Sequence, residues 1–195
     1  MYLEAALLTG GASRRMGRDK ATLEIAGLPL AETIASRILA VGVPLTVLGP
    51  EAIPGCTLQQ DATPHEGPLV ALSRFRPRAE FVFVCSCDLP LLDARIIEVL
   101  SDLIEERDAA IPLSQGRLQP LCALYRAQAL AGLPEWLRQG SRRVMEWIEC
   151  LHYIRVPEEV LESRGLSRYC VRSANTPEEL ELLLSPKAAR LEPEA

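Results

Sequence analysis

Residues Phe81–Cys85 read FVFVC, an unbroken run of β-branched, aromatic and thiol side chains near the middle of the chain. A strand that is apolar on both faces must be covered on both faces, which is typical of a parallel sheet between helices. Short apolar segments alternate with segments of helical periodicity on either side of this run, and such alternation predicts connections through helices. We therefore predict an α/β fold, a three-layer sandwich with a mostly parallel central sheet.

The same signals predict the other elements. Further strands are expected at Tyr2–Leu8, Leu45–Leu48, Thr57–Gln59, Ala109–Pro112, Pro120–Tyr125, Tyr153–Val156 and Tyr169–Val171. Helices are expected at Ala31–Ala40, Leu69–Arg74, Ala94–Glu106, Ala127–Arg138 and Arg142–Trp147, the third of them with Asp93 as its N-cap. A last helix opens at Thr176, where Pro177 suits the first turn and Glu179 completes a capping box.

Length and composition exclude several classes of protein. The 195 residues fit one domain over residues 1–184, followed by a polar, flexible tail at 185–195. A net charge of −5 argues against a nucleic-acid partner, which needs a basic face. The sequence lacks a secretory signal and the roughly 18 apolar residues of a membrane span. The six cysteines form no C-x-x-C pair, which favours free thiols in a reducing cytoplasm.

The loop after the first predicted strand is a candidate anion site, because ligands of parallel sheets bind beyond the carboxyl ends of the strands. Gly10 and Gly11 allow the backbone to approach a ligand closely. Four cations follow within seven residues, Arg14, Arg15, Arg18 and Lys20. The spacing is neither that of a P-loop nor G-x-G-x-x-G. A tight turn before a solvated basic stretch is the competing interpretation, and the position after a buried strand favours phosphate binding.

The same segment carries a longer pattern, G-G-x-S-x-R-M-G-x-D-K-x-x-L-x-x-x-G-x-P-L. This pattern resembles the opening of the molybdenum cofactor guanylyltransferases, which belong to a superfamily of nucleotidyltransferases. The matching residues are Gly10, Gly11, Ser13, Arg15, Met16, Gly17, Asp19, Lys20, Leu23, Gly27, Pro29 and Leu30. The resemblance spans roughly residues 3–184 and implies a Rossmann-like central sheet of the nucleotide-diphospho-sugar transferase type.

Two carboxylates are candidate site residues. Asp88 follows the central predicted strand, where a carboxylate can hold Mg²⁺ against nucleotide phosphates. Its C-D-x-P segment resembles the metal-binding segment of the family, and a structural aspartate in a turn is the alternative. Asp61, which is followed by Gly67-Pro68-Leu69, would otherwise be an ordinary loop carboxylate, and the resemblance implies that it contacts the nucleotide. The alternating thiols of Cys85 and Cys87 indicate packing rather than a shared metal site.

The second half of the chain resembles the family in three places. Gln119–Tyr125 matches a Q-P-L-x-A-L-Y strand. Arg142 and Arg143 lie in a basic loop that the resemblance places against the pterin acceptor, while a solvated helix N-terminus is an equal alternative. Asn175 matches the second asparagine of an N-x-N-T-P-E-[DE]-L motif and is expected to bind the acceptor, whereas Ser173 replaces the first.

The resemblance implies that the chain transfers GMP from GTP to the phosphate of molybdenum-molybdopterin, releasing pyrophosphate. Mg²⁺ held by Asp88 is the implied cofactor, and Lys20 and Arg15 are assigned to the phosphates. The nucleotide would further contact Leu8, Thr9, Gly10, Gly11 and Asp61. Partners implied are GTP, a molybdopterin-type cofactor, and molybdoenzymes or their chaperones that receive the product.

Other functions stay open. A cytidylyl-transferring sibling branch reads L-A-A-G where this chain reads Leu8-Thr9-Gly10-Gly11, so Gly10 favours guanine. Sugar-1-phosphate nucleotidyltransferases are more distant, because those chains are usually longer. A domain that binds a nucleotide or a partner enzyme without catalysis is the third alternative, against which Asp88 and Lys20 argue.

Overall fold

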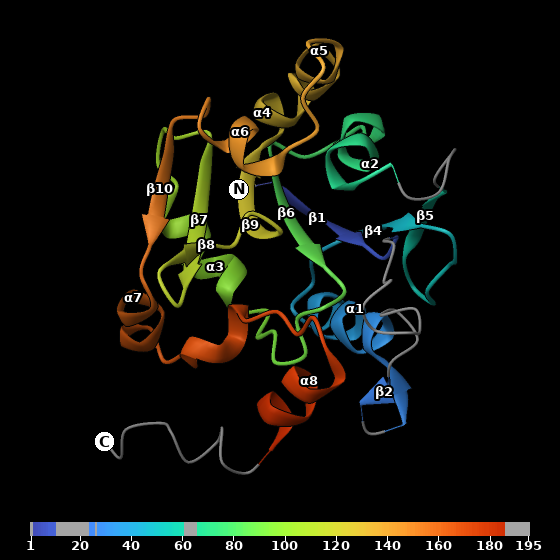
Figure 1. Cartoon of the computed structure of the whole chain (residues 1–195), viewed down its shortest axis with the longest axis vertical. Coiled ribbons are helices and arrows are strands. Elements are labelled where there is room, and N and C mark those ends of the chain that lie inside the picture. Colours follow the sequence, from blue (N-terminus) through green and yellow to red (C-terminus); the bar gives the residue numbers. More distant parts are fainter. Residues whose placement is uncertain (1, 11–23, 26, 61–65, 186–195) are drawn as a thin grey trace.

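The computed structural model describes residues 2–10, 24–25, 27–60 and 66–185. Within them the strands are β1 Leu3–Leu8, β2 Glu24–Ile25, β3 Leu28–Pro29, β4 Leu45–Gly49, β5 Thr57–Gln60, β6 Phe81–Ser86, β7 Ala109–Ser114, β8 Arg117–Leu118, β9 Cys122–Arg126 and β10 Tyr153–Val156. An eight-stranded sheet runs through the molecule in the order β10-β7-β9-β6-β1-β4-β5, with β8 paired to β7 beside this path (Figure 1). β2 and β3 form a separate two-stranded ladder.

The sheet is mostly parallel, as predicted. β6, β1, β4 and β5 are parallel neighbours, and β10 is parallel to β7. The exception on the path is β9, which is antiparallel to both β6 and β7. A tight turn at Gln115 and Gly116, both with positive φ, reverses the chain between β7 and β8. β8 and β9 are both antiparallel to β7, so the chain passes from β7 into them without a crossover helix.

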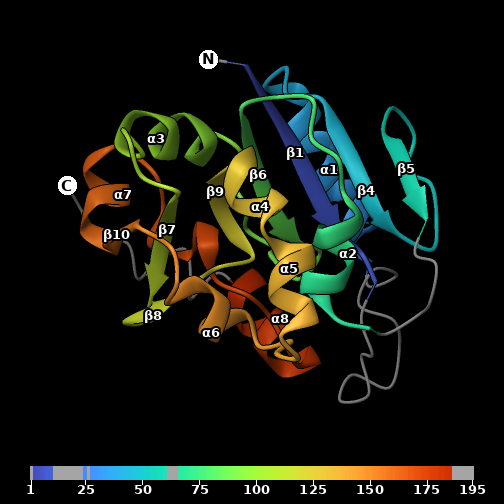
Figure 2. The same ribbon diagram turned by 90° about the horizontal axis from the view of Figure 1, so that it is seen from above.

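The helices cover both faces of the sheet. They are α1 Leu30–Ala40, α2 Pro68–Arg74, α3 Ile96–Leu103, α4 Ala127–Ala131, α5 Leu133–Arg138, α6 Val144–Ile148, α7 Glu158–Ser163 and α8 Pro177–Leu184, with a 3₁₀ turn, η2, at Arg168–Val171. Buried side chains of α1, α3 and α7 join one hydrophobic cluster, and those of α2, α4, α5 and α6 join another. The two groups of helices lie on opposite sides of the sheet (Figure 2). The three-layer sandwich is therefore confirmed.

Strand β6 shows why the central run is apolar throughout. Phe81, Phe83 and Cys85 face the layer of α1 and α3, whereas Val82 and Val84 face the layer of α2 and α4. All five side chains are buried. The two alternating sets of side chains thus supply the centres of two separate hydrophobic clusters.

The predicted helix Ala94–Glu106 is shorter at both ends than the sequence suggested. Its α-helical part begins at Ile96, and the Asp93 carboxylate accepts the Arg95 N–H at 3.0 Å within the preceding turn. Asp93 therefore stabilises this turn and is not the N-cap of α3, which is Arg95. At the other end Glu105 takes a φ of 45°, a left-handed conformation that cannot continue a helix.

The prediction of a strand at Tyr169–Val171 is wrong. These residues belong to the 3₁₀ turn η2, whose N-cap Ser167 accepts the Tyr169 N–H through its side chain. Cys170 and Val171 are both buried although they are consecutive, which a strand covered on one face would not allow. A three-residue apolar run is too short for its periodicity to separate a strand from a turn.

The predicted helix Ala127–Arg138 is two helices, α4 and α5, divided at Gly132. Pro134 at the start of α5 has no N–H to donate to the preceding turn, so the hydrogen-bond ladder is interrupted there. The helix predicted at Arg142–Trp147 begins at Val144, so Arg142 and Arg143 precede it. The short elements β2, β3, β8 and α7 were not predicted.

Candidate active site

The candidate site lies at the carboxyl ends of three adjacent parallel strands. β1 is hydrogen-bonded to β4 on one side and to β6 on the other, with Leu8 opposite Leu48 and Ser86. Thr9 and Gly10 therefore leave the sheet beside the turn that carries Asp88. The fold brings these two segments, 78 or more residues apart in sequence, together at the carboxyl ends of the central strands (Figure 1).

Hydrogen bonds fix the end of β1 on both sides. The Thr9 N–H donates to the Leu48 carbonyl at 3.1 Å, and the Leu8 carbonyl accepts the Cys87 N–H at 3.1 Å. The Leu8 side chain is buried in the core against α2. Two backbone groups that could meet a nucleotide base are thus already bonded within the protein. Contacts from residues 8–10 to a ligand must come from the remaining groups.

Gly49 is a part of the site that the sequence analysis missed. A Cβ atom added to Gly49 would lie 1.9 Å from the Thr9 Oγ1 and 3.2 Å from the Gly10 nitrogen. Thr9 occupies the space that any other residue at position 49 would fill, and its hydroxyl is buried without a hydrogen-bond partner in the described part of the chain. A glycine at the end of a predicted strand marks such a close approach, and this signal was present in the sequence.

Asp88 is held at two points. Its carboxylate oxygen Oδ1 accepts the Ser86 hydroxyl at 2.5 Å, and its backbone carbonyl accepts the Ala174 N–H at 2.8 Å. The second bond joins the turn after β6 to the segment before α8. Two regions that the sequence predicted separately, the metal carboxylate and the Ser173–Asn175 motif, are therefore adjacent.

The residues around Asp88 fit a magnesium ion better than a metal ion that takes all of its ligands from protein side chains. Among the described residues, no three His, Cys, Asp or Glu side chains gather to form a metal cluster. Mg²⁺ often takes one or two carboxylates and completes its shell with phosphate oxygens and water. Burial raises the pKa of the Cys85 thiol far above its ordinary range, so this sulfur stays protonated and is a poor ligand.

Asn175 precedes α8 and is exposed. The Thr176 hydroxyl accepts the Glu179 N–H at 3.2 Å, and the Glu179 carboxylate accepts the Asn175 N–H at 2.6 Å. Thr176 is therefore the cap of α8, as predicted, and the side chain of Asn175 is not needed for that purpose. The Asn175 amide nitrogen lies 3.4 Å from the Ser173 hydroxyl, a long contact between the two motif positions.

Arg142 and Arg143 are exposed at the start of α6. Arg143 forms an ion pair with Glu146 at 2.9 Å, and the same carboxylate accepts the Ser141 hydroxyl at 2.5 Å. α6 packs in the layer with α2 and α4, whereas α8 packs against Leu91 and Tyr169. This local network resembles a solvated helix N-terminus, which was one of the two alternatives for these arginines.

A protein-family model described as the MobA-like NTP transferase domain matches residues 5–154. The chain belongs to this family. The probable molybdenum cofactor guanylyltransferase of Nostoc sp. is 29% identical over 194 residues, covering 93% of this chain and 90% of that protein. The protein of the same description from Natronomonas pharaonis is 30% identical, covering 90% of this chain and 93% of its own length. The chain is thus a nucleotidyltransferase.

Solved structures place the MobA-like chain in the same fold. Molybdopterin-guanine dinucleotide biosynthesis protein A from Archaeoglobus fulgidus has a TM-score of 0.78 at 20% identity, covering 96% of this chain and 100% of that one. The 2-C-methyl-D-erythritol 4-phosphate cytidylyltransferase of Thermus thermophilus has a TM-score of 0.65 at 15% identity, covering 98% and 100%. These likenesses confirm the predicted Rossmann-like fold of the nucleotide-diphospho-sugar transferase type.

Several candidate residues of the MobA-like chain lie outside the described residues, namely Gly11, Arg15, Lys20 and Asp61. Their assignments rest on the sequence. Within the described residues no helix has the length and apolar character needed to cross a membrane.

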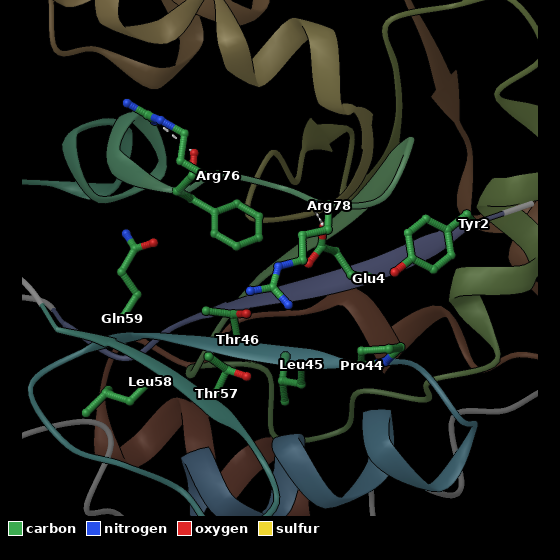
Figure 3. Close-up of a pocket in the computed structure, with 11 residues that line it drawn as sticks. Tyr2, Glu4, Pro44, Leu45, Thr46, Thr57, Leu58, Gln59, Arg76 and Arg78 are labelled. Carbon is green, nitrogen blue, oxygen red and sulfur yellow. Dashed lines mark hydrogen bonds between the residues drawn. The ribbon is translucent and has the colours of Figure 1, made fainter.

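A cavity of about 370 Å³ lies elsewhere on the MobA-like chain, near the amino ends of β1 and β4 (Figure 3). It is lined by Tyr2, Glu4, Pro44, Leu45, Thr46, Thr57, Leu58, Gln59, Phe75, Arg76 and Arg78. The Glu4 carboxylate accepts the backbone N–H groups of Arg78 and Ala79, which ties the segment after α2 to β1. None of the candidate site residues that the structure describes lines this cavity.

Proposed function

We propose that the chain transfers GMP from GTP to the phosphate of molybdenum-molybdopterin, forming the guanine dinucleotide cofactor and pyrophosphate. The observation that carries this proposal is the position of Asp88, beside the exit of β1 and bonded to the segment that carries Asn175. A nucleotide at the end of β1 and an acceptor at Asn175 would flank one carboxylate. The two relatives described above as probable guanylyltransferases support guanylyl transfer in particular.

In this proposal the nucleotide contacts Leu8, Thr9, Gly10, Gly11 and Asp61. Lys20 and Arg15 compensate the charge of the phosphates, and Asn175 binds the acceptor, whereas the ion pair of Arg143 with Glu146 favours the solvated alternative for Arg142 and Arg143. Asp88 would hold Mg²⁺, which supplies further compensation of negative charge on the phosphates when bound.

The reaction needs no general base from the protein. The acceptor is a phosphate monoester with a second pKa of about 6, so most of it is already a dianion at pH 7. One of its oxygens attacks the α-phosphorus of GTP, and the bond to the bridging oxygen of pyrophosphate breaks. The protein contributes by aligning the two substrates and offsetting the charge that develops on the leaving group.

The product is proposed to pass to a molybdoenzyme or its chaperone in the cytoplasm. The six cysteines all lie in the described residues and form no disulfide, and four of them are buried, which fits a reducing compartment. A cytidylyl transfer to the same acceptor is the second candidate function, and Gly10 in place of alanine is the feature that favours guanine.

The substitution Asp88→Asn tests the catalytic role, because it removes the charge and keeps the shape. We expect pyrophosphate release from GTP to fall roughly 100-fold or more, since a metal ligand contributes several kcal/mol of charge stabilisation. The matched control is Asp102→Asn on α3, where the carboxylate pairs with Arg164 at 3.0 Å on the surface. Wild-type turnover in a folded Asp88→Asn variant would remove Asp88 from the mechanism, whereas absent turnover in the wild-type protein would favour a non-catalytic binding role.

A further inference from the structure

Ser86 interrupts the apolar pattern of β6 at its last residue. The side chains of Val82 and Val84 pack in the hydrophobic cluster against α2, and the alternation of the strand places Ser86 on the same face. A third apolar side chain would continue this cluster. The sequence therefore has a hydroxyl where packing alone favours a hydrophobic residue.

The Ser86 hydroxyl has two acceptors in reach. Its Oγ lies 2.5 Å from the Asp88 Oδ1 and 3.4 Å from the Leu121 carbonyl oxygen. A serine hydroxyl has one proton to donate, and the much shorter distance assigns that proton to the carboxylate. A hydrogen bond to a charged acceptor is also the stronger of the two.

The backbone around Ser86 is fixed by the sheet. The Ser86 N–H donates to the Leu121 carbonyl at 2.9 Å, at the entry to β9, and the next N–H, of Cys87, donates to Leu8 in β1. Ser86 is thus tied to both neighbouring strands of β6. A carboxylate bonded to its hydroxyl is held in a fixed position relative to the sheet, as a site residue must be.

We propose that Ser86 is a positioning residue, which orients the Asp88 carboxylate toward the Mg²⁺ of a nucleotide complex. This inference rests on the proposed function. The hydrogen bond from Ser86 fixes the side chain of Asp88, and the hydrogen bond from Ala174 fixes the Asp88 backbone. Outer partners that orient metal-binding carboxylates commonly contribute a factor of about 10 to 100 in metal affinity.

The test measures metal binding directly, by electron paramagnetic resonance of Mn²⁺ with GTP and without an acceptor, so that no turnover occurs. In Ser86→Ala we expect the Mn²⁺ dissociation constant to rise about tenfold. Ser86→Thr keeps the hydroxyl and should bind Mn²⁺ like wild type. Ser86→Cys fills the same space with a thiol, which is a weak donor, so its Mn²⁺ affinity should be as low as that of Ser86→Ala. This variant separates the loss of the hydrogen bond from the effect of a cavity.

The matched control is Ser101→Ala in α3, where the hydroxyl donates to the Ile97 carbonyl at 2.7 Å within the helix. We expect this variant to bind Mn²⁺ like wild type. Wild-type Mn²⁺ affinity in folded Ser86→Ala and Ser86→Cys overturns the role of Ser86, even if the wild-type enzyme transfers GMP. Wild-type protein that binds Mn²⁺ and GTP but transfers no GMP overturns the proposed function alone. A wild-type protein that binds no Mn²⁺ with GTP overturns both.

Discussion

Replacing Gly49 with alanine adds one methyl group at the tightest contact of the candidate site. The new Cβ would lie 1.9 Å from the Thr9 Oγ1 and 3.2 Å from the Thr9 Cβ. An ordinary contact of this kind is at least about 3.4 Å, so the hydroxyl must move by about 1.5 Å or change rotamer. Since β1 and β4 are both central to the sheet, the strain falls on the segment that begins with Thr9.

Overpacking of this kind typically costs about 1–3 kcal/mol, and the short contact places Gly49→Ala near the upper end. A loss of about 3 kcal/mol lowers the melting temperature of a chain of this length by roughly 6–12 °C. The displaced Thr9 and Gly10 should also raise the KM for GTP. Calorimetry and steady-state kinetics measure the two effects separately.

A second substitution shows whether the contact with the Thr9 hydroxyl causes the loss of stability in Gly49→Ala. Thr9→Ala removes the atom at 1.9 Å, so the Gly49→Ala/Thr9→Ala double variant should regain most of the lost stability. Thr9→Val keeps an atom in that place and should not rescue Gly49→Ala. Equal melting temperatures for wild type and Gly49→Ala, or equal rescue by alanine and valine, would refute the reasoning.

Two further predictions concern stability. Thr176→Ala removes the side-chain cap of α8 and should lower the free energy of unfolding by about 1 kcal/mol, measured by urea denaturation, while Thr176→Ser should stay within error of wild type. Burial raises the pKa of the Cys85 and Cys122 thiols above their ordinary value of 9.0, so the folded chain keeps protons that the unfolded chain releases at high pH. The free energy of unfolding should therefore fall as the pH rises past 9, by about 1.4 kcal/mol per thiol and pH unit. Cys85→Ala should reduce this pH dependence by the contribution of one thiol, and an unchanged dependence would contradict the raised pKa of Cys85.

Long or strongly patterned features were predictable from the sequence. The run at Phe81–Cys85 predicted a strand covered on both faces, because every side chain in it must be buried somewhere. The capping residues at Thr176 predicted the start of α8, because the cap bonds to its own helix. Both signals depend on neighbours in the chain.

Features that depend on distant contacts were not predictable. The reversal of β9 follows from its pairing with β6 and β7, and the run Cys122–Arg126 does not encode direction. Tyr169–Val171 was assigned to the wrong class because three apolar residues fit a strand and a 3₁₀ turn equally. The sequence marked Gly49 as a point of close approach, but its contact with Thr9 and the role of Ser86 appear only when β4 and β6 are placed on either side of β1.

The central claim is most directly tested by identifying the product made from two competing nucleotides. The wild-type protein would be incubated with Mg²⁺, molybdenum-molybdopterin and equal concentrations of GTP and CTP. The products would then be separated and identified by mass spectrometry. We predict the guanine dinucleotide cofactor together with an equal amount of pyrophosphate. A cytosine dinucleotide as the main product would contradict the choice of guanine, and the absence of any dinucleotide would contradict the proposed reaction itself.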